Sequence, residues 1–296
     1  MPVSRRSTNP SRAWRLTLRF ALPAYVLAAA YLLVLGESGL VALLTANGLY
    51  LAVMVWLTTR VTDSITNGSI RTGRARPATW WQLGVVTVIV LVTAIGPSSV
   101  PIWSDVVGWF HDLGESFLPV RWFGGPGNAI ANPIQYFVAP LVLLLALGAR
   151  ARCLGLGRGH RVWRVSVLWL ALPAAVSLGL VVMGAVGPQT VARRFIANAF
   201  QNGFFEEFLF RGALQTRLSK VMSEPWAWMV QALVFGLWHV RANTQMMDGN
   251  VAAGLAVCIV SQFVTGLAFG HVFRTTRNLI APSVAHVATN VLGQSF

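Results

Sequence analysis

Long apolar runs separated by short polar segments make up the first two thirds of the chain. Five runs carry no charged residue, and each approaches or exceeds the roughly 20 apolar residues that a helix needs to cross a bilayer. We therefore predict five membrane-spanning helices in this region, at Phe20–Gly36, Ser38–Thr59, Trp80–Trp103, Pro133–Ala149 and Val165–Gly187.

The polar segments between the runs predict how the chain is oriented. Arginines dominate the segments Ser4–Arg19, Arg60–Arg76 and Arg150–Arg164. By the positive-inside rule these three segments, and with them the N-terminus, are expected on the cytoplasmic side. The segment Ser104–Asn132 is acidic and aromatic instead, with a Gly-Gly-Pro-Gly turn at Gly124–Gly127. We expect it to lie on the membrane surface.

Ionisable groups interrupt the apolar runs in the last third of the chain. These runs are Ala192–Lys220, Trp226–Arg241, Val251–Phe273 and Leu279–Leu292. Together the runs predict an all-α, polytopic bundle of transmembrane helices with about eight or nine spans. We expect a boundary near Arg164, between an N-terminal transmembrane anchor region (1–164) and a functional core (165–296).

Composition supports a chain that is solvated by lipid. Of its 296 residues, 55% are hydrophobic and only 11% are charged, and the mean hydropathy is +0.61. Soluble domains carry about 25% charged residues. The net charge of +14 does not indicate nucleic-acid binding, because the basic residues lie between apolar runs rather than along one face. All but one of them are arginine, which favours a bacterial chain in the plasma membrane.

Two adjacent glutamates stand out in the run Phe-Phe-Glu-Glu-Phe-Leu-Phe-Arg. A charge at membrane depth costs about 2.5–3.5 kcal/mol, so it persists where it has a role. Glu207 and Arg211 are four residues apart and can pair on one helix face. Glu206 is rotated by about 100°, onto the face of Asn198 and Asn202. One glutamate therefore reads as structural and the other as available for chemistry, although a purely structural ion pair is the simpler alternative.

Two further pairs lie at the same four-residue spacing. Phe235 and His239 share a face in Phe-Gly-Leu-Trp-His, and His286 and Asn290 share one in Ala-His-Val-Ala-Thr-Asn. An imidazole and an amide aligned in this way can donate hydrogen bonds to one point. Each pair taken alone is equally compatible with a packing histidine or with a polar contact between helices.

The three elements in this order resemble the CPBP family of intramembrane proteases, over about Ala192–Leu292. This family comprises CAAX prenyl endopeptidases of type 2 and bacteriocin-processing and self-immunity (Abi-like) proteins. The resemblance implies that Glu206 is the general base and activates a water together with His239. It also implies that Glu207 holds Arg211, and that His286 and Asn290 stabilise the oxyanion.

The leading interpretation is an intramembrane endopeptidase that acts on a membrane-associated peptide or protein. Peptide hydrolysis needs a base for water and donors for the tetrahedral intermediate, and both are present. One alternative is a non-catalytic immunity or scaffold protein on the same fold. Another is a transporter with a Glu/His proton relay, which would predict two related halves with broken helices. The sequence contains no such repeat.

A metal is an open question at this stage. If zinc is bound, its ligands would be Glu206, His239 and His286, which are common ligand types in catalytic zinc sites. Two observations favour a metal-free mechanism: the chain lacks a His-Glu-x-x-His helix, and a zinc-bound Glu206 could not serve as the base. The remaining histidines are interpreted as solvated (His111, His160) or interfacial (His271). We expect no other cofactor and no disulfide.

The predicted orientation can be tested by reporter fusions. Reporters fused at Arg71 and Arg158 should both show cytoplasmic activity, because both positions lie in arginine-rich connections. Fusions within Ser104–Asn132 provide the control and should report the opposite side. Extracytoplasmic signals at both arginines would contradict the orientation.

Overall fold

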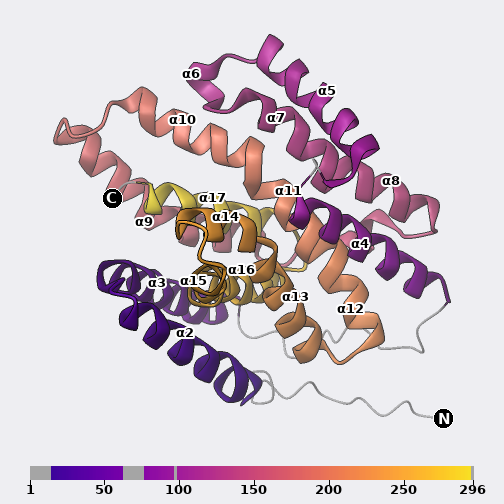
Figure 1. Ribbon diagram of the computed structural model, residues 1–296, viewed down its shortest axis with the longest axis horizontal. Coiled ribbons are helices and arrows are strands. Elements are labelled where there is room, and N and C mark those ends of the chain that lie inside the picture. Colours follow the sequence, from indigo (N-terminus) through magenta and orange to yellow (C-terminus); the bar gives the residue numbers. More distant parts are fainter. Residues whose placement is uncertain (1–14, 63–76, 97–98, 295–296) are drawn as a thin grey trace. The chain divides into compact units, whose positions relative to one another are not determined.

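The structure is a computed structural model that describes residues 15–62, 77–96 and 99–294 (Figure 1). Most of the expected N-terminal basic segment and most of the loop at Arg60–Arg76, including Arg71, lie outside these residues. Helices account for the regular structure of the described residues, which contain no strand. The all-α prediction is therefore confirmed for this part of the chain.

The chain divides into two compact units, each built from two separate stretches. Unit 1 comprises residues 1–80 and 215–271, and unit 2 comprises residues 81–214 and 272–296. The boundary expected near Arg164 stays a prediction.

Six helical segments in the described residues are long and apolar enough to cross a membrane. They are Thr17–Val34, Ser38–Thr62, Pro77–Ile95, Pro126–Ala146, Val162–Val182 and Val251–Thr276. The expected count of eight or nine spans is not confirmed. Three other runs were expected to span, at Ala192–Lys220, Trp226–Arg241 and Leu279–Leu292. They are largely helical, but polar residues interrupt the first of them. The helices α13 (Glu224–Trp238) and α17 (Ile280–Gly293) have only 15 and 14 residues.

The structure differs from the sequence prediction in where the third span ends and where the fourth span begins. Helix α4 (Pro77–Ile95) ends before Gly96, whose φ of 91° requires a left-handed backbone, and not at Trp103. Trp103 instead belongs to α5 (Pro101–Phe117). The fourth span begins at Pro126 rather than Pro133, because α7 (Pro126–Pro133) continues through its proline into a π-helical segment, η3 (Ile134–Val138), and α8 (Ala139–Ala146).

The segment expected on the membrane surface folds into short helices of unit 2. The glycine-rich turn separates α6 (Val120–Phe123) from α7, and α5 packs alongside α7 (Figure 1). Gly114 allows this close approach, because a Cβ there would lie 2.3 Å from the carbonyl oxygen of Pro126. The Glu115 carboxylate accepts a hydrogen bond of 2.9 Å from the backbone N–H of Gly127.

Unit 1 contains a close contact between α13 and α16 (Val264–Thr276). Its helices include η1 (Thr17–Ala21), α2 (Leu22–Val34), α3 (Ser38–Thr62), α12 (Thr216–Val221), α13, α14 (Val240–Met246), α15 (Val251–Val257), the π segment η7 (Cys258–Phe263) and most of α16. The indole N–H of the buried Trp228 donates to the carbonyl oxygen of Leu267, at 2.8 Å. Gly266 packs directly on Ala232.

Unit 2 centres on α17, which packs against α9 (Val162–Val182) and α10 (Pro188–Asn198). Hydrogen bonds fasten the arginine-rich loop to the start of α17. The Asn278 amide donates to the carbonyl oxygen of Gly157 at 2.6 Å, and the backbone N–H of His160 donates to Thr276 at 2.7 Å. His160 is therefore not a freely solvated loop residue, and its Nε2 atom is buried.

The close contact at Gly266 predicts a specific sensitivity to side-chain volume. A Cβ at Gly266 would lie 2.9 Å from the Cα of Ala232, whereas one at Gly39 would meet nothing within 4 Å. We expect Gly266→Val to lower stability by about 1–3 kcal/mol through overpacking, and Gly39→Val to have a much smaller effect. Thermal unfolding in detergent measures both, and equal changes would show that the α13–α16 contact is not tight.

Candidate active site

A single long helix of unit 2 carries both glutamates, and its geometry changes where they lie. It runs from Pro188 to Leu214 in this unit, through α10, the π segment η5 (Ala199–Gly203), α11 (Phe204–Glu207) and the π segment η6, which extends to Gln215. One turn of α-helix is therefore flanked by π-helix on both sides. Wide turns of this kind are frequent at functional sites.

Aromatic packing and two glycines hold this helix in place. The ring of Phe137, from the fourth span, contacts the rings of Phe204 and Phe208 at centroid distances of 5.3 and 4.8 Å. A Cβ at Gly203 would lie 2.4 Å from the side chain of Val287, and one at Gly212 would lie 2.7 Å from the carbonyl oxygen of Leu154. Because Gly203 has no side chain, α17 can approach the helix before the glutamates. Because Gly212 has none, the segment that contains Leu154 can approach the helix after them.

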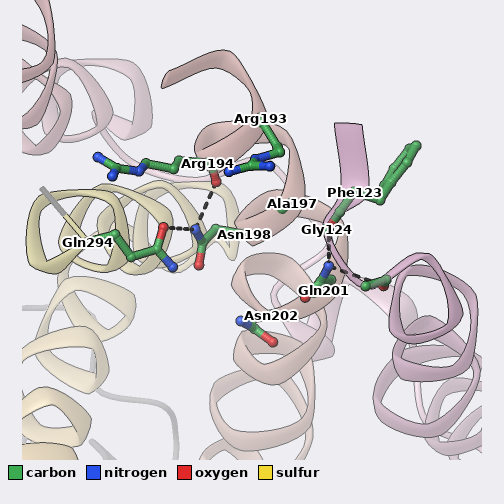
Figure 2. Close-up of a pocket in the computed structure, with 10 residues that line it drawn as sticks. Phe123, Gly124, Arg193, Arg194, Ala197, Asn198, Gln201, Asn202 and Gln294 are labelled. Carbon is green, nitrogen blue, oxygen red and sulfur yellow. Dashed lines mark hydrogen bonds between the residues drawn. The ribbon is translucent and has the colours of Figure 1, made fainter. Parts of the chain in front are cut away.

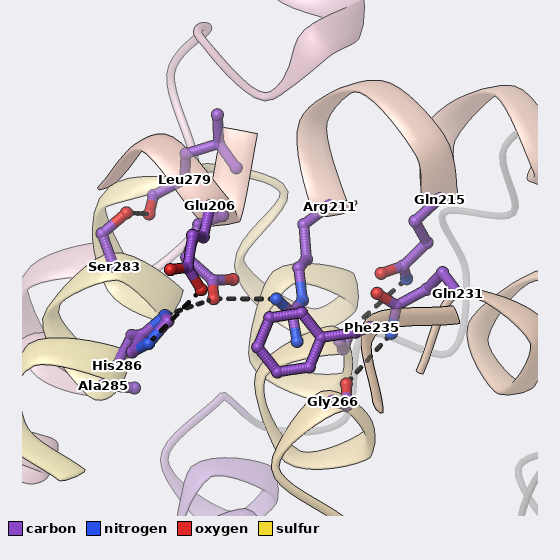
Figure 3. A network of polar contacts seen from close by, with 12 residues as sticks. Glu206, Arg211, Gln215, Gln231, Phe235, Gly266, Leu279, Ser283, Ala285 and His286 are labelled. Carbon is purple, nitrogen blue, oxygen red and sulfur yellow. Dashed lines mark hydrogen bonds and ion pairs between the residues drawn. The ribbon is translucent and has the colours of Figure 1, made fainter. Parts of the chain in front are cut away.

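The glutamates form a buried ionic cluster with residues from two helices (Figure 3). The Glu207 Oε1 atom accepts a hydrogen bond of 2.8 Å from Arg211 Nη1, so the predicted ion pair is present. The same oxygen contacts His286 Nδ1 at 3.0 Å. His286 Nε2 lies 3.9 Å from Glu206 Oε2. Glu207 and Arg211 are fully buried, and Glu206 and His286 are nearly so.

These contacts constrain the protons of His286. Glu207 acts as an acceptor toward Arg211, and a carboxylate accepts hydrogen bonds without donating them, so the Nδ1 of His286 carries a proton. The Nε2 atom is then an acceptor in the neutral ring and a donor only in the doubly protonated ring. In that second form the four groups carry two negative and two positive charges, which is the balance that buried charges require.

Both glutamates retain an oxygen that could accept a further hydrogen bond. The Oε2 atoms of Glu206 and Glu207 are buried and have no hydrogen-bond partner among the described residues. Buried acceptors of this kind are commonly satisfied by water. A water bound at Glu206 Oε2 would lie next to the imidazole of His286, whose Nε2 is 3.9 Å from that oxygen.

Asn290 continues a polar stripe along α17 rather than joining the ionic cluster directly. Its amide donates to Asn198 Oδ1 at 3.1 Å, and the Asn198 amide donates to Gln294 Oε1, also at 3.1 Å. His286, Asn290 and Gln294 follow one another at four-residue spacing and share one face of the helix. Sequence analysis missed Gln294, although its spacing repeats that of His286 and Asn290.

The face predicted to join Asn198, Asn202 and Glu206 is divided in the structure. Asn198 and Asn202 line a pocket of about 540 Å³, and Glu206 does not line it (Figure 2). The prediction assumed a rotation of 100° per residue, which holds for an α-helix. The π segment η5 between Asn198 and Glu206 has a wider turn and changes this phase.

His239 belongs to unit 1, where it caps the C-terminal end of α13. Its Nδ1 atom lies 2.8 Å from the carbonyl oxygen of Phe235, and the Phe235 and His239 rings meet edge-on with centroids 4.8 Å apart. A carbonyl oxygen only accepts hydrogen bonds, so Nδ1 carries the proton, and Nε2 is the basic nitrogen of the neutral ring. The four-residue spacing of Phe235 and His239 is thus explained by local packing and by a fixed tautomer.

The described residues include no group of three or more His, Cys, Asp or Glu side chains arranged to hold a metal ion. Glu206 and His286 belong to unit 2 and His239 belongs to unit 1. The zinc set of these three residues stays a prediction.

The other histidines contribute to packing. His111 is half-exposed, with 44% of its side chain accessible, and it lies against Gly127. His271 Nε2 lies 3.1 Å from the Thr59 hydroxyl, and its ring meets that of Trp228 edge-on. The structure thus gives His271 a place in the packing of unit 1.

Comparison with known proteins finds a family to which about a third of the chain is similar. Residues 188–292 match the family described as type II CAAX prenyl endopeptidase Rce1-like. No curated protein and no solved structure matches the chain. The matched segment contains all six candidate site residues and supports a CAAX-type intramembrane protease. The comparisons do not extend this support to the bacteriocin-processing and self-immunity proteins.

The ionic cluster predicts different consequences for its two glutamates. Glu207→Gln and Arg211→Ala should each lower stability by about 3–5 kcal/mol, because each leaves a buried charge without its partner. Glu206→Gln should cost far less, since Glu206 Oε2 lies 3.9 Å from His286 Nε2, beyond hydrogen-bonding distance, whereas Glu207 contacts both Arg211 and His286 directly. Thermal and denaturant unfolding in detergent measures these changes.

A double variant provides the control for this experiment. Glu207→Leu combined with Arg211→Leu removes both charges, and it should be more stable than the sum of the separate Glu207→Leu and Arg211→Leu changes predicts. Additive losses would show that the two side chains do not form a coupled buried pair. A greater loss for Glu206→Gln than for Glu207→Gln would show that the structural and chemical roles of the two glutamates are assigned in the wrong order.

Proposed function

We propose that this protein is an intramembrane endopeptidase in which Glu206 activates the attacking water. The observation that carries the proposal is the buried cluster of Glu206, Glu207, Arg211 and His286, set in a helix flanked by π segments. A cluster built only for stability needs Glu207 and Arg211. The second carboxylate, whose Oε2 atom is buried without a hydrogen-bond partner among the described residues, is costly unless it takes part in chemistry.

The proposed reaction proceeds by general base catalysis. Glu206 takes a proton from the water as the water oxygen attacks the peptide carbonyl carbon, and the family resemblance assigns His239 to the orientation of this water. The carbonyl oxygen becomes an oxyanion, which doubly protonated His286 and the Asn290 amide stabilise as donors. Glu206 then passes its proton to the leaving nitrogen, the C–N bond breaks, and a carboxylic acid and an amine are released.

The proposed setting is the bacterial plasma membrane with the N-terminus in the cytoplasm. The substrate is a peptide or protein that reaches the site from the membrane. Glu207 acts in this proposal as a positioning residue: it orients His286 through Nδ1 and is itself fixed by Arg211. A group that only orients the imidazole contributes to the rate through preorganisation.

The test is hydrolysis of a quenched-fluorescence peptide library by purified protein in nanodiscs. Glu206→Gln should lower kcat/KM by about 10²–10⁴-fold, the usual contribution of a general base, with an unchanged melting temperature. Glu37→Gln is the matched control, since Glu37 lies in the turn between α2 and α3, and it should retain full activity. Absence of hydrolysis by the wild-type protein across the library would favour the non-catalytic immunity or scaffold alternative.

The metal-free form of this mechanism is tested separately. We expect activity to survive chelation, and elemental analysis of the active protein to find much less than one zinc per chain. One zinc per chain, lost together with activity on chelation and restored with it on re-addition, would contradict the metal-free mechanism. It would indicate a metal site with Glu206, His239 and His286 as the ligands to examine first.

A further inference from the structure

The arginine-rich loop of unit 2, residues Arg150–Arg164, lies between the ends of candidate membrane spans. The span Pro126–Ala146 leads into the loop, and the span Val162–Val182 begins within it. Because a helix leaves the bilayer at the end of its apolar run, we expect the loop at the level of the lipid headgroups. Trp163, whose accessible fraction is 70%, is the kind of side chain that is enriched at this level. The loop carries five arginines and no acidic residue: Arg150, Arg152, Arg158, Arg161 and Arg164.

The loop is fastened to the end of a third span. The backbone N–H of His160 donates to the carbonyl oxygen of Thr276 at 2.7 Å, and Thr276 is the last residue of the span Val251–Thr276. A Cβ at Gly159 would lie 2.7 Å from the same carbonyl oxygen, so the two backbones are in direct contact. Three span ends therefore meet at this loop.

These contacts bring arginines from two distant segments of the chain together. Arg277 lies between Thr276 and Asn278, the two residues that bond to the loop. Arg158 and Arg161 flank the two loop residues that contact Thr276. The segment 272–279, like the loop, contains no acidic residue. Three guanidinium groups therefore belong to one small area of unit 2, and an anion bound there would offset their mutual repulsion.

Two of these arginines hold an unfavourable backbone conformation. Arg161 has a φ of 47° and Arg277 a φ of 55°, both in the left-handed region. Residues with a Cβ are disfavoured in this region, and strain of this kind is concentrated at ligand-binding and other functional sites. Arg161 is also the N-cap residue of α9, where a cation adds to the partial positive charge of the helix end. Membrane orientation requires positive charges in the loop, but it does not require this geometry.

We propose that Arg158, Arg161 and Arg277 bind the phosphate of an anionic phospholipid, such as phosphatidylglycerol, at the membrane surface. A guanidinium group presents paired N–H donors that match the oxygens of a phosphate. The meeting of three span ends favours a lipid as the source of this phosphate, because basic sites between transmembrane helices bind lipid headgroups. The inference does not depend on the proposed protease function.

The proposed lipid site adjoins the helix that carries two of the candidate site residues. Asn278 Oδ1 accepts a hydrogen bond of 2.7 Å from the backbone N–H of Ile280, the first residue of α17. The amide of the same side chain donates to the carbonyl oxygen of Gly157 in the loop. A lipid that holds the loop therefore also stabilises the start of α17. Because the site exists only in the folded protein, lipid binding should raise the unfolding temperature.

The experiment measures lipid binding to the full-length protein in an uncharged detergent. Dioleoylphosphatidylglycerol and dioleoylphosphatidylcholine are titrated separately, native mass spectrometry counts the bound lipids, and thermal unfolding measures the stabilisation. We expect phosphatidylglycerol to bind at least about tenfold more tightly than phosphatidylcholine, as a gained charge-assisted hydrogen bond implies. Phosphatidylglycerol should also raise the unfolding temperature more. Inorganic phosphate at the same concentration is the soluble competitor, and it should not displace the lipid.

Arginine variants show whether the lipid binds at this site. Arg158→Gln and Arg277→Gln should each weaken phosphatidylglycerol binding by about tenfold. Arg121→Gln is the matched control, since it removes the same charge from an exposed residue of α6, outside the loop and the start of α17, and it should leave the affinity unchanged. Arg161→Gly removes a charge and also relieves the left-handed strain. It should therefore weaken lipid binding without lowering the unfolding temperature of the lipid-free protein.

Three outcomes would overturn the proposal: equal affinities for the two lipids, equal effects of Arg158→Gln and Arg121→Gln, or displacement of the lipid by inorganic phosphate. The last would assign the arginines to a soluble anion. If a glutamine variant unfolds at a lower temperature without lipid, Arg161→Gly decides, and an unchanged lipid affinity of that variant would refute the site. Peptide hydrolysis is measured separately, and its absence would refute the protease without affecting the lipid site.

Discussion

The contact between Glu207, Arg211 and His286 is the interaction on which the candidate site depends. Two carboxylates lie next to each other in an apolar helix, and such charges are tolerated in a low-dielectric interior only when they are neutralised and hydrogen-bonded. Glu207 receives Arg211 on one side and His286 on the other through a single oxygen. This shared oxygen links the glutamate helix to α17, and it determines which nitrogen of His286 faces Glu206.

Close packing of backbone makes this contact geometrically feasible. The imidazole of His286 reaches Glu207 because Gly203 offers no side chain to keep α17 at a distance. A large side chain is needed elsewhere on the helix. The ring of Phe137 packs beside Phe204 and Phe208 and limits rotation of the helix. Small residues in one contact and large rings in another thus fix the orientation of the two glutamates, in the manner typical of helix packing in membranes.

Sequence reasoning recovered the helical class and the ion pair because both follow from local rules. Apolar run length locates spans, and a four-residue spacing places Glu207 beside Arg211. It could not reveal that His286 shares the same oxygen, because that contact depends on tertiary packing across 79 residues of sequence. It placed the end of the third span too late because no charge marks the break at Gly96. It also missed Gln294, whose four-residue spacing from Asn290 was a signal and whose side chain accepts a hydrogen bond from Asn198.

The π segment η5 has a consequence for how such a site can change. A π-helical turn closes its hydrogen bond over five residues instead of four, so it accommodates an extra residue without interrupting the helix. The angular phase between Asn198 on one side and Glu206 on the other is consequently set by this short stretch rather than by the side chains themselves. Gain or loss of one residue there would rotate the pocket wall against the carboxylates while leaving the chemistry of both intact. The orientation of the Asn198 side chain and that of the carboxylates are thus separable along a single continuous helix.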